Sequence, residues 1–228
     1  MTSPRPDPAQ SSHGLDDLPQ RIAVAVPAAA VAVAAVAAGG IFFAALLALV
    51  GVMAAREAYR LLTAPAGSRA VVAALVTLIW IGVPVVHAVL LRELPHGGGL
   101  VIDVMLAVFL GDTAAHLFGS AFGRHKLAPR VSPNKTVEGL VAGIVVGTGV
   151  VVVFAAAFQP WLDLGIALAL GLAVSIAAPA GDLFESAIKR RAGVKDSGRL
   201  LGAHGGVLDR VDAVLFGVVA GYYVALAL

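Results

Sequence analysis

The chain has 228 residues, of which 59% are hydrophobic and only 13% are charged. Its mean hydropathy of +0.92 lies outside the range of soluble domains and predicts a membrane protein. The formal net charge is +2. In membrane proteins, Lys and Arg are mainly distributed according to the side of the membrane on which a loop lies, so we do not interpret this charge as a sign of nucleic-acid binding and expect no nucleic-acid partner. The absence of cysteine excludes disulfides, thiolate nucleophiles and zinc–cysteine sites.

Seven apolar stretches of the sequence are long enough, as helices, to cross the roughly 30 Å hydrocarbon core of a bilayer. The alternating ten-residue segments of an outer-membrane barrel do not occur in the sequence. We therefore predict an all-α, polytopic integral membrane protein with about seven transmembrane helices. The stretches are 22–38, 40–55, 70–91, 99–118, 137–158, 162–181 and 207–228.

Residues 1–20 are rich in Pro, Ser and Asp and predict a disordered cytoplasmic tail, followed by a single membrane domain over 21–228. A cleaved signal peptide within 1–38 is the competing interpretation, although the leader before the apolar run is long and acidic. With the N-terminus inside, every Lys and Arg except Arg92 falls on the cytoplasmic side. The positive-inside rule therefore predicts a cytoplasmic N-terminus and cytoplasmic polar loops.

The stretch 99–118 carries three ionisable side chains that differ in depth. A charge inside a membrane helix is costly and usually has a function. Asp103 lies near the outer end, where it can snorkel or pair with Arg92, so we interpret it as structural. Asp112 lies about 13 Å deeper, and His116 follows one turn later on the same face. This pair predicts a polar, substrate-binding cavity.

The segment "SPNKT", residues 132–136, precedes the fifth stretch. Ser132 and Pro133 are preferred at the N-cap and first position of a helix, so we expect them to begin it. A helix N-terminus beside Asn134, Lys135 and Thr136 would bind an anion. An ordinary capped helix with a topology-determining lysine is equally compatible with this pattern.

The segment that begins "GDLFESAIKRR" places Asp182, Glu185, Ser186 and Lys189 on one helix face. A solvated helix end would account for the lysine but poorly for Asp182, which follows an apolar run. The cationic side chains from here onward could meet a polyphosphate or the anionic leaflet. They are Lys189, Arg190, Arg191, Lys195, Arg199 and Arg210.

The segment "HGGVLDRVD", residues 204–212, combines turn residues with carboxylates. Gly205 and Gly206 permit a sharp turn and a close backbone approach to a ligand. Asp209 and Asp212 lie three residues apart on a helix and face nearly the same way. Such carboxylates suit Mg²⁺ when substrate phosphates complete its shell, whereas Zn²⁺ would favour His or Cys. No Walker A or dinucleotide-binding glycine motif occurs in the sequence.

The sequence "SAIKRRAGVKDSGRLLGAHGGVLDRVD", residues 186–212, resembles the signature of CDP-diacylglycerol synthases, also called phosphatidate cytidylyltransferases. "HKLAPRVSPNKTVEG" and "GDLFES" resemble other stretches of that family, so the resemblance covers about 111–228. It implies an enzyme that transfers CMP from CTP to phosphatidic acid, yielding CDP-diacylglycerol and pyrophosphate. It also implies a plasma-membrane location, an active site facing the cytoplasm, and a homodimer.

The resemblance implies a role for each candidate residue, with Asp182 and Asp209 as ligands of Mg²⁺, to which a monovalent cation could be added. The implied catalytic residues are Asp182, Lys189, Arg190, Lys195, Asp196, His204, Asp209, Arg210 and Asp212. The candidate substrate-binding residues, several of them chosen on their position in the sequence before the resemblance is considered, are Asp112, His116, Ser132, Asn134, Lys135, Thr136, Ser186, Gly205 and Gly206. His116 stands where the family commonly has an aromatic residue.

Two other classes of membrane protein also use carboxylates to bind metal ions. A CDP-alcohol phosphatidyltransferase also handles lipid pyrophosphates, but its D-G-x2-A-R-x8-G-x3-D-x3-D pattern is missing from the sequence. A cation transporter could use Asp112, Asp182 and Asp209 as intramembrane ligands. A transporter needs carboxylates near the midplane and exits on both sides, whereas the predicted topology gathers nearly all charge on one side.

Overall fold

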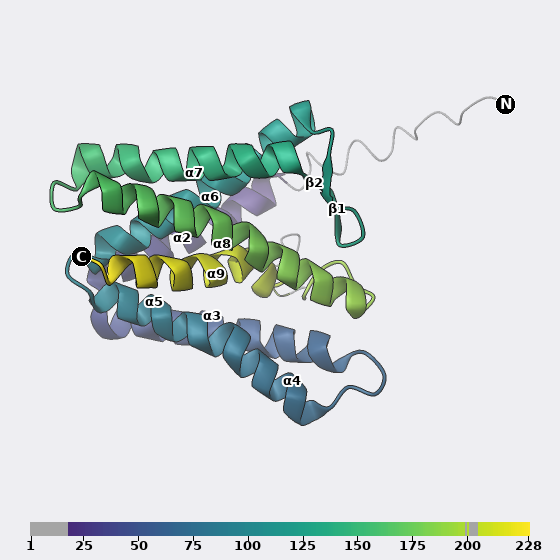
Figure 1. The fold of residues 1–228 in the computed structure, drawn as a ribbon. Helices are drawn as coiled ribbons and strands as arrows, with labels where there is room; N and C mark the ends of the chain where they lie inside the picture. The colour runs from purple at the N-terminus through teal and green to yellow at the C-terminus, as the bar shows by residue number, and fades with distance from the viewer. Residues whose placement is uncertain (1–17, 199, 201–204) are drawn as a thin grey trace.

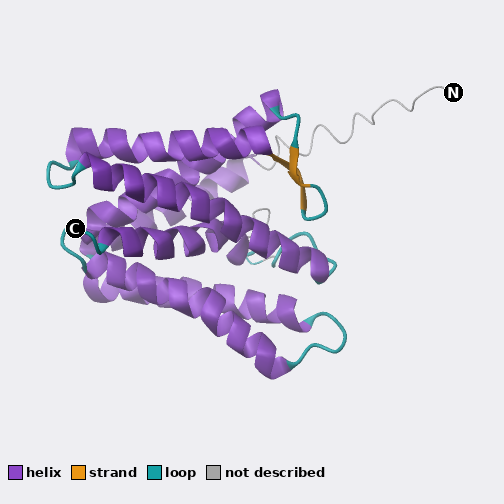
Figure 2. Cartoon of the chain, viewed as in Figure 1, coloured by secondary structure: helices purple, strands orange, loops and turns teal. Residues whose placement is uncertain are grey.

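The computed structural model describes residues 18–198, 200 and 205–228, with side chains from residue 26 onward. Helical rods run back and forth through one bundle, and one short hairpin projects from it (Figure 1, Figure 2). The short segments α4, η1 and α5 follow each other without a break. The elements are α2 (Leu18–Ala38), α3 (Gly40–Thr63), α4 (Ala70–Thr77), η1 (Leu78–Gly82), α5 (Val83–Glu93), α6 (Gly97–Phe122), β1 (Lys126–Ala128), β2 (Ser132–Thr136), α7 (Val137–Phe158), α8 (Leu164–Arg191) and α9 (Leu208–Ala225).

The all-α membrane fold predicted from the sequence is confirmed, since each of the seven apolar stretches forms a helix. Within the described residues, five helical rods are long and apolar enough to cross a membrane: α3, the continuous rod from α4 to α5, α6, α7 and α8. The described apolar part of α2, Val26–Ala38, is shorter. Helix α9 has 18 residues and begins with the charged sequence "LDRVD".

Several helices continue beyond their apolar stretches. Helix α3 extends to Thr63 and α8 to Arg191, past predicted ends at 55 and 181. Apolar composition marks the length that lipid can cover, whereas helical hydrogen bonding continues wherever the chain still packs against its neighbours. These extensions carry charged side chains to one end of the bundle.

The links between helices alternate between the two ends of the bundle (Figure 1). The α3–α4 link, the β1–β2 hairpin and the described residues 192–198 and 205–207 lie at one end, which we call the polar end. The α5–α6 link, the α7–α8 link and the C-terminus lie at the other end. The placement of the polar end in the cytoplasm stays a prediction, and residues 1–17 of the predicted tail lie outside the described residues.

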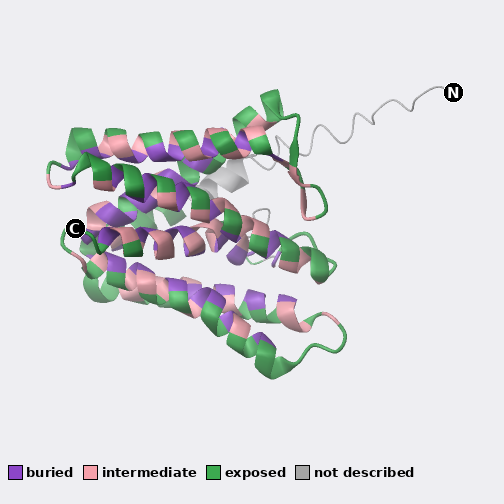
Figure 3. Ribbon diagram, in the orientation of Figure 1, coloured by how far each residue is buried: buried purple, intermediate pink, exposed green. Residues whose placement is uncertain are grey.

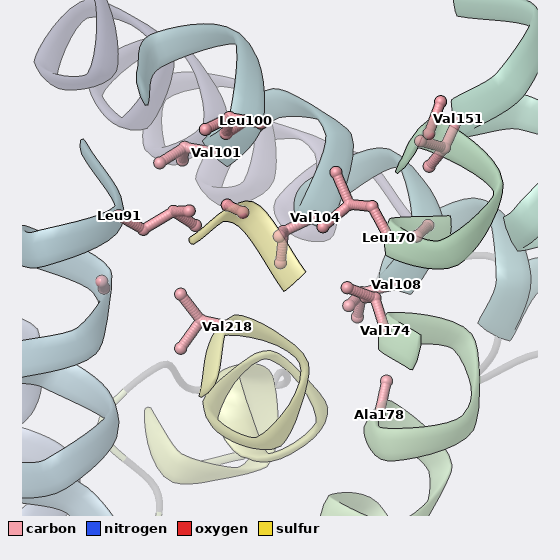
Figure 4. Packing of buried hydrophobic residues seen from close by; sticks show 14 of the residues in the cluster. Leu91, Leu100, Val101, Val104, Val108, Val151, Leu170, Val174, Ala178 and Val218 are labelled. Atoms are coloured by element: carbon pink, nitrogen blue, oxygen red, sulfur yellow. The ribbon is translucent and has the colours of Figure 1, made fainter. Parts of the chain in front are cut away.

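The helices pack around a core of aliphatic side chains. Val104 of α6, Leu170 and Val174 of α8, and Val218 of α9 meet there (Figure 4). Many large apolar side chains are instead exposed on the outer faces of the bundle, as a lipid-facing surface requires (Figure 3). Because lipid tails are as apolar as the core, helix association in a membrane depends mainly on close packing.

The close contact of α7 with its neighbours depends on glycines. A Cβ atom at Gly143 would lie 2.9 Å from the carbonyl oxygen of Gly111. At Gly147 a Cβ atom would lie 2.7 Å from the carbonyl oxygen of Ala107 and 2.5 Å from Oγ of Ser175. Helices α6, α7 and α8 therefore approach each other at distances that larger residues at these glycines would prevent.

The π-helical turn η1 has a local cause at Pro84. Proline lacks a backbone N–H, and its ring clashes with the carbonyl group four residues earlier, at Trp80. The helix widens over Leu78–Gly82 before it resumes as α5. The Trp80 ring is buried and meets Phe184 of α8 edge to face, with 4.9 Å between the ring centroids.

The prediction that Ser132 and Pro133 begin the fifth helix is wrong. Both residues belong to β2, where Ser132 pairs with Ala128 of β1. The helix begins five residues later, at Val137, and its N-cap is Thr136, whose hydroxyl accepts a hydrogen bond from the N–H of Gly139 at 3.1 Å. Pairing with β1 holds this segment extended, which overrides the local preference of Ser-Pro to start a helix.

Of the two arrangements considered for Asp103, pairing with Arg92 does not occur among the described residues. Arg92 donates to the carbonyl oxygens of Val36 and Ala37, at 2.8 and 3.5 Å, and so ties α5 to the end of α2. Asp103 is fully buried, and within the described residues its carboxylate oxygens have no hydrogen-bond partner. It lies near the start of α6, far along the helix from Asp112.

The glycine packing predicts a contrast between two positions on α7. Gly147→Val should lower the free energy of unfolding by about 1–3 kcal/mol, because the added atoms collide with α6 and α8. Gly149→Val is the matched control, since a Cβ atom there has nothing within 4 Å. Thermal unfolding in detergent measures both, and an equal loss of stability in the two variants would contradict the packing.

Candidate functional site

A charged cavity of about 810 Å³, the main cavity, opens among α6, α8, α9 and the segment that precedes α9. The charged turns of α8 and α9 both lie at the polar end and contribute carboxylates to its lining. Asp112 of α6 adds another. Of the four residues expected on one face, Asp182, Glu185 and Lys189 line this cavity, whereas Ser186 does not line it and instead donates to Asp182. Its charged lining consists of Asp112, Asp182, Glu185, Lys189, Asp196, Asp209, Arg210 and Asp212.

A second cavity of about 540 Å³, the side cavity, lies among α6, α7, α8 and the hairpin. Asp112 and Asp182 line both cavities, so the two hollows meet at these carboxylates. His116 lines the side cavity one turn from Asp112, which agrees with the polar cavity expected on that helix face. The hairpin contributes Ser132, Asn134, Lys135 and Thr136 to the same lining. The candidate substrate-binding residues of the hairpin thus lie together although Ser132 does not cap a helix.

Two lysines hold the carboxylates of the site in ion pairs. Lys135 of β2 pairs with Oδ2 of Asp182, whose Oδ1 accepts a hydrogen bond from Ser186 at 3.3 Å. Lys189 lies 2.6 Å from Oε2 of Glu185 and 2.7 Å from Oδ1 of Asp209. The side chains of Lys189, Glu185 and Asp209 are 12%, 0% and 9% exposed, so this triad is largely removed from water. The ion pairs join β2 to α8 and α8 to α9.

The backbone around Gly205 fixes the carboxylate of Asp209. The N–H groups of Ser197 and Gly206 donate to Oδ2 of Asp209 at 3.0 and 2.8 Å. Gly205 has a φ of 80°, and a Cβ atom there would lie 2.8 Å from the same oxygen. The predicted sharp turn is confirmed at Gly205. Gly206 is buried against protein side chains, where a Cβ atom would collide with Ser197 and Glu57.

Some candidate residues lie away from the two cavities. Arg190 donates to the carbonyl oxygens of Val131 and Val194, at 3.3 and 2.9 Å, and thereby ties the hairpin to the end of α8. Lys195 is exposed, and neither it nor Arg190 belongs to the lining of the main or the side cavity. Ser186 is buried and acts on the site through its bond to Asp182. His204 lies outside the described residues.

Two acidic residues at the site were not among the candidates. Glu185 is fully buried, and its Oε1 has no hydrogen-bond partner in the described part of the chain. Its spacing from Asp182 and Lys189 was the signal that could have identified it. Glu57 of α3 is buried and accepts hydrogen bonds from Ser197 and Leu208, which are 140 or more residues away along the chain. The sequence offers no local signal for that contact.

The donor set is compatible with a magnesium ion. Carboxylate oxygens are the hard ligands that Mg²⁺ favours, and the unpartnered Oε1 of Glu185 lies among several of them. Among the described residues, no group of three or more His, Asp or Glu side chains is placed to hold a metal by itself. Mg²⁺ commonly binds one or two carboxylates and completes its shell with phosphate and water, which this arrangement permits.

The fold and the site define a class of protein: a polytopic α-helical membrane protein with carboxylates and cations gathered in cavities at one end of the bundle. Residues 64–228 match the sequence model described as the Cytidylyltransferase family. The chain belongs to this family.

Curated relatives of the chain carry the name phosphatidate cytidylyltransferase. The protein of Staphylococcus haemolyticus is 43% identical over 116 residues, which cover 51% of this chain and 45% of the relative. The protein of Staphylococcus saprophyticus is 39% identical over 142 residues, or 62% and 54% of the two chains. The protein of Mycobacterium leprae is 40% identical over 139 residues, or 60% and 43%. The chain spans about half the length of the curated relatives that it matches.

The cap at Thr136 can be tested separately from the rejected cap at Ser132. Thr136→Val keeps the side-chain shape but removes the acceptor of the Gly139 N–H, and it should cost about 0.5–2 kcal/mol of stability. Ser132→Ala should leave the first turn of α7 intact. Hydrogen exchange at the start of α7 measures the difference, and faster exchange in Ser132→Ala than in Thr136→Val would contradict the observed N-cap.

The buried triad predicts a large effect at Lys189. Lys189→Met leaves Glu185 and Asp209 facing each other without their cation and should cost about 3–5 kcal/mol in detergent unfolding. Adding Glu185→Gln should restore part of that loss, since one of the two opposed charges is removed. Lys195→Met, at an exposed lysine, is the control, and equal melting temperatures for the two single variants would contradict the role of Lys189.

Proposed function

We propose that the chain transfers CMP from CTP to phosphatidic acid and yields CDP-diacylglycerol and pyrophosphate. The observation that carries the proposal is the main cavity, where carboxylates from α6, α8 and α9 converge with cations from α8 and α9. Membership of the Cytidylyltransferase family and the names of the relatives support the same reaction.

The proposed reaction is limited by charge and hardly at all by proton transfer. A phosphate monoester has a second pKa of about 6, so its oxygen is already anionic near neutral pH and needs no general base. This oxygen attacks the α-phosphorus of CTP, and the bond from that phosphorus to the β-phosphate oxygen breaks in line. Cationic side chains must then offset the charges of the crowded phosphates.

The cations that line the cavities are placed for that task. Lys189 and Arg210 line the main cavity, and Lys135 lines the side cavity. Lys135 also pairs with Asp182 at the junction of the two cavities. A phosphate that enters either cavity would therefore meet a lysine already held in place by a carboxylate.

Asp182 and Asp209 would hold a magnesium ion, and Asp212 would support them from the next turn of α9. Bound there, Mg²⁺ would neutralise phosphate charge and orient the leaving pyrophosphate. The protein's own contribution is to fix the carboxylates, with Ser186 oriented toward Asp182 and two backbone N–H groups toward Asp209.

The two substrates would reach the site from different phases. CTP is soluble, whereas phosphatidic acid lies in the membrane leaflet. Phe109 lines the main cavity and is 54% exposed, which provides an apolar wall next to the charged residues. This combination suits a lipid whose phosphate enters the cavity while its acyl chains stay in the bilayer. The plasma-membrane location, the cytoplasmic polar end, a monovalent cation and a homodimer stay predictions.

The proposal predicts opposite outcomes at two aspartates. In an assay with labelled CTP, phosphatidic acid and Mg²⁺, Asp209→Asn should lower turnover by about a hundredfold or more, because it weakens the site for metal and phosphate. Asp103→Asn should stay within about threefold of the unchanged protein, since Asp103 lines neither cavity.

Asp103→Asn should elute and melt as the unchanged protein does, whereas Asp209→Asn should stay folded with a lower melting temperature, because Lys189 loses one of its two carboxylate partners. Equal losses at the two positions would place the site elsewhere. Absence of lipid-bound CMP with the unchanged protein, together with cation flux into liposomes, would overturn the enzyme in favour of a transporter.

A further inference from the structure

Glu57 of α3 connects the N-terminal helices to the site, although it lines neither the main nor the side cavity. It is buried, with 6% of its surface exposed, although Arg56 and Arg60 beside it on the same helix are exposed. We infer that Glu57 is a positioning residue that holds the start of α9 and, through Ser197, the carboxylate of Asp209 in its working orientation. The inference rests on the proposed function, since it assigns a role within the same site.

The contacts of Glu57 are made with one carboxylate oxygen. Its Oε2 accepts a hydrogen bond from Oγ of Ser197 and another from the N–H of Leu208, each at 2.9 Å. Leu208 is the first residue of α9, whose N-cap residue, Val207, provides no side-chain hydrogen bond. Glu57 thus supplies from α3 the acceptor that a local Ser, Thr or Asp would supply at an ordinary helix start.

Ser197 connects Glu57 to the candidate metal ligand. Its hydroxyl donates to Glu57, while its backbone N–H donates to Asp209 at 3.0 Å. The N–H of Gly206, which lies between these groups along the chain, donates to the same oxygen of Asp209 at 2.8 Å. Displacement of Ser197 or of the first turn of α9 would therefore move the carboxylate that the reaction is proposed to use.

Two positions next to Glu57 have room only for glycine. A Cβ atom at Gly198 would lie 2.5 Å from Oε1 of Glu57, and one at Gly206 would collide with Oε2 of Glu57 and with Ser197. The absence of a side chain at both glycines therefore leaves room for the carboxylate of Glu57. Gly206 of the "HGG" sequence, interpreted from the sequence as a close approach to a ligand, instead lets Glu57 reach the backbone.

A carboxylate suits this position because it accepts more strongly than a neutral oxygen. Hydrogen bonds to an ionised acceptor are roughly twice as strong as those between neutral groups. A buried N–H that loses its acceptor destabilises the segment that carries it. Loss of Glu57 should therefore loosen the segment on which Asp209 depends, while the rest of the bundle keeps its packing.

Three variants test the inference by kinetics. Glu57→Leu removes both acceptor bonds and should lower kcat by about tenfold to a hundredfold, with the KM for CTP within about twofold. Glu57→Gln keeps an oxygen for the same donors and should restore kcat to within about threefold. Arg56→Gln, an exposed neighbour on α3, should match the unchanged protein.

A structural readout accompanies the kinetics. Hydrogen exchange of the amides of Gly206 and Leu208 should be faster in Glu57→Leu by about tenfold, while the amides of α7 stay unchanged. This readout does not depend on activity, so it also tests the position of Glu57 if no CDP-diacylglycerol is formed. Product absent from the unchanged protein would overturn the proposed function alone, whereas unchanged exchange in Glu57→Leu would overturn the role of Glu57.

The link through Ser197 is tested by a double-mutant cycle. If Glu57 acts through this hydroxyl, Ser197→Ala should lower kcat less in the Glu57→Leu background than in the unchanged protein. Independent, multiplicative losses would overturn the link. A lower melting temperature in Glu57→Leu with kcat and exchange unchanged would assign Glu57 to stability only and would also overturn the inference.

Discussion

The buried triad in which Lys189 lies between Glu185 and Asp209 is the interaction on which the arrangement of the site depends. It joins α8 to α9 at the polar end, where both helices would otherwise place carboxylates against each other. Removing like charges from water and bringing them together is unfavourable unless a cation is held in the same place. The second ion pair, between Lys135 and Asp182, does the same between the hairpin and α8. The site is thus assembled by opposite charges from separate elements.

The glycine contacts of α7 determine how closely these elements can approach. Gly143 and Gly147 allow α7 to lie directly against α6 and α8, so that the hairpin after α6 reaches the side of α8. Aliphatic packing of Val104, Val174 and Val218 holds α6, α8 and α9 around one core (Figure 4). The charged turns then lie at the end of a closely packed bundle, and their geometry follows from helices that have little freedom to move apart.

Helix α3, in the N-terminal part of the chain, contributes to the site through a single charged side chain. Helix α3 is mainly apolar, yet its Glu57 accepts hydrogen bonds from Ser197 and Leu208 near the start of α9. The residues that match the family begin at 64, so Glu57 lies just before the matched region. We interpret these observations as a division of roles. The C-terminal helices provide the charged residues of the cavities, and α3 holds one part of the site in position through Glu57.

The class of fold follows from local sequence, because an apolar run of membrane length can satisfy its backbone hydrogen bonds in lipid only as a helix. Local sequence also determines that Asp182, Glu185 and Lys189 share a face, since helical spacing alone decides this. The sharp turn at Gly205 followed from the same kind of local rule. These are properties of short segments, which need no knowledge of what packs against them.

The partner of each charged side chain depends instead on how the helices and the hairpin pack in the folded chain. Strand pairing with β1 moved the helix start from Ser132 to Thr136, and backbone carbonyl groups took Arg190 away from the cavities. The contact of Glu57 with Ser197 spans 140 residues, and no local pattern encodes such a separation. Long-range contacts of this kind depend on how whole helices pack, and so the partners of the charged residues could be read only from the folded chain.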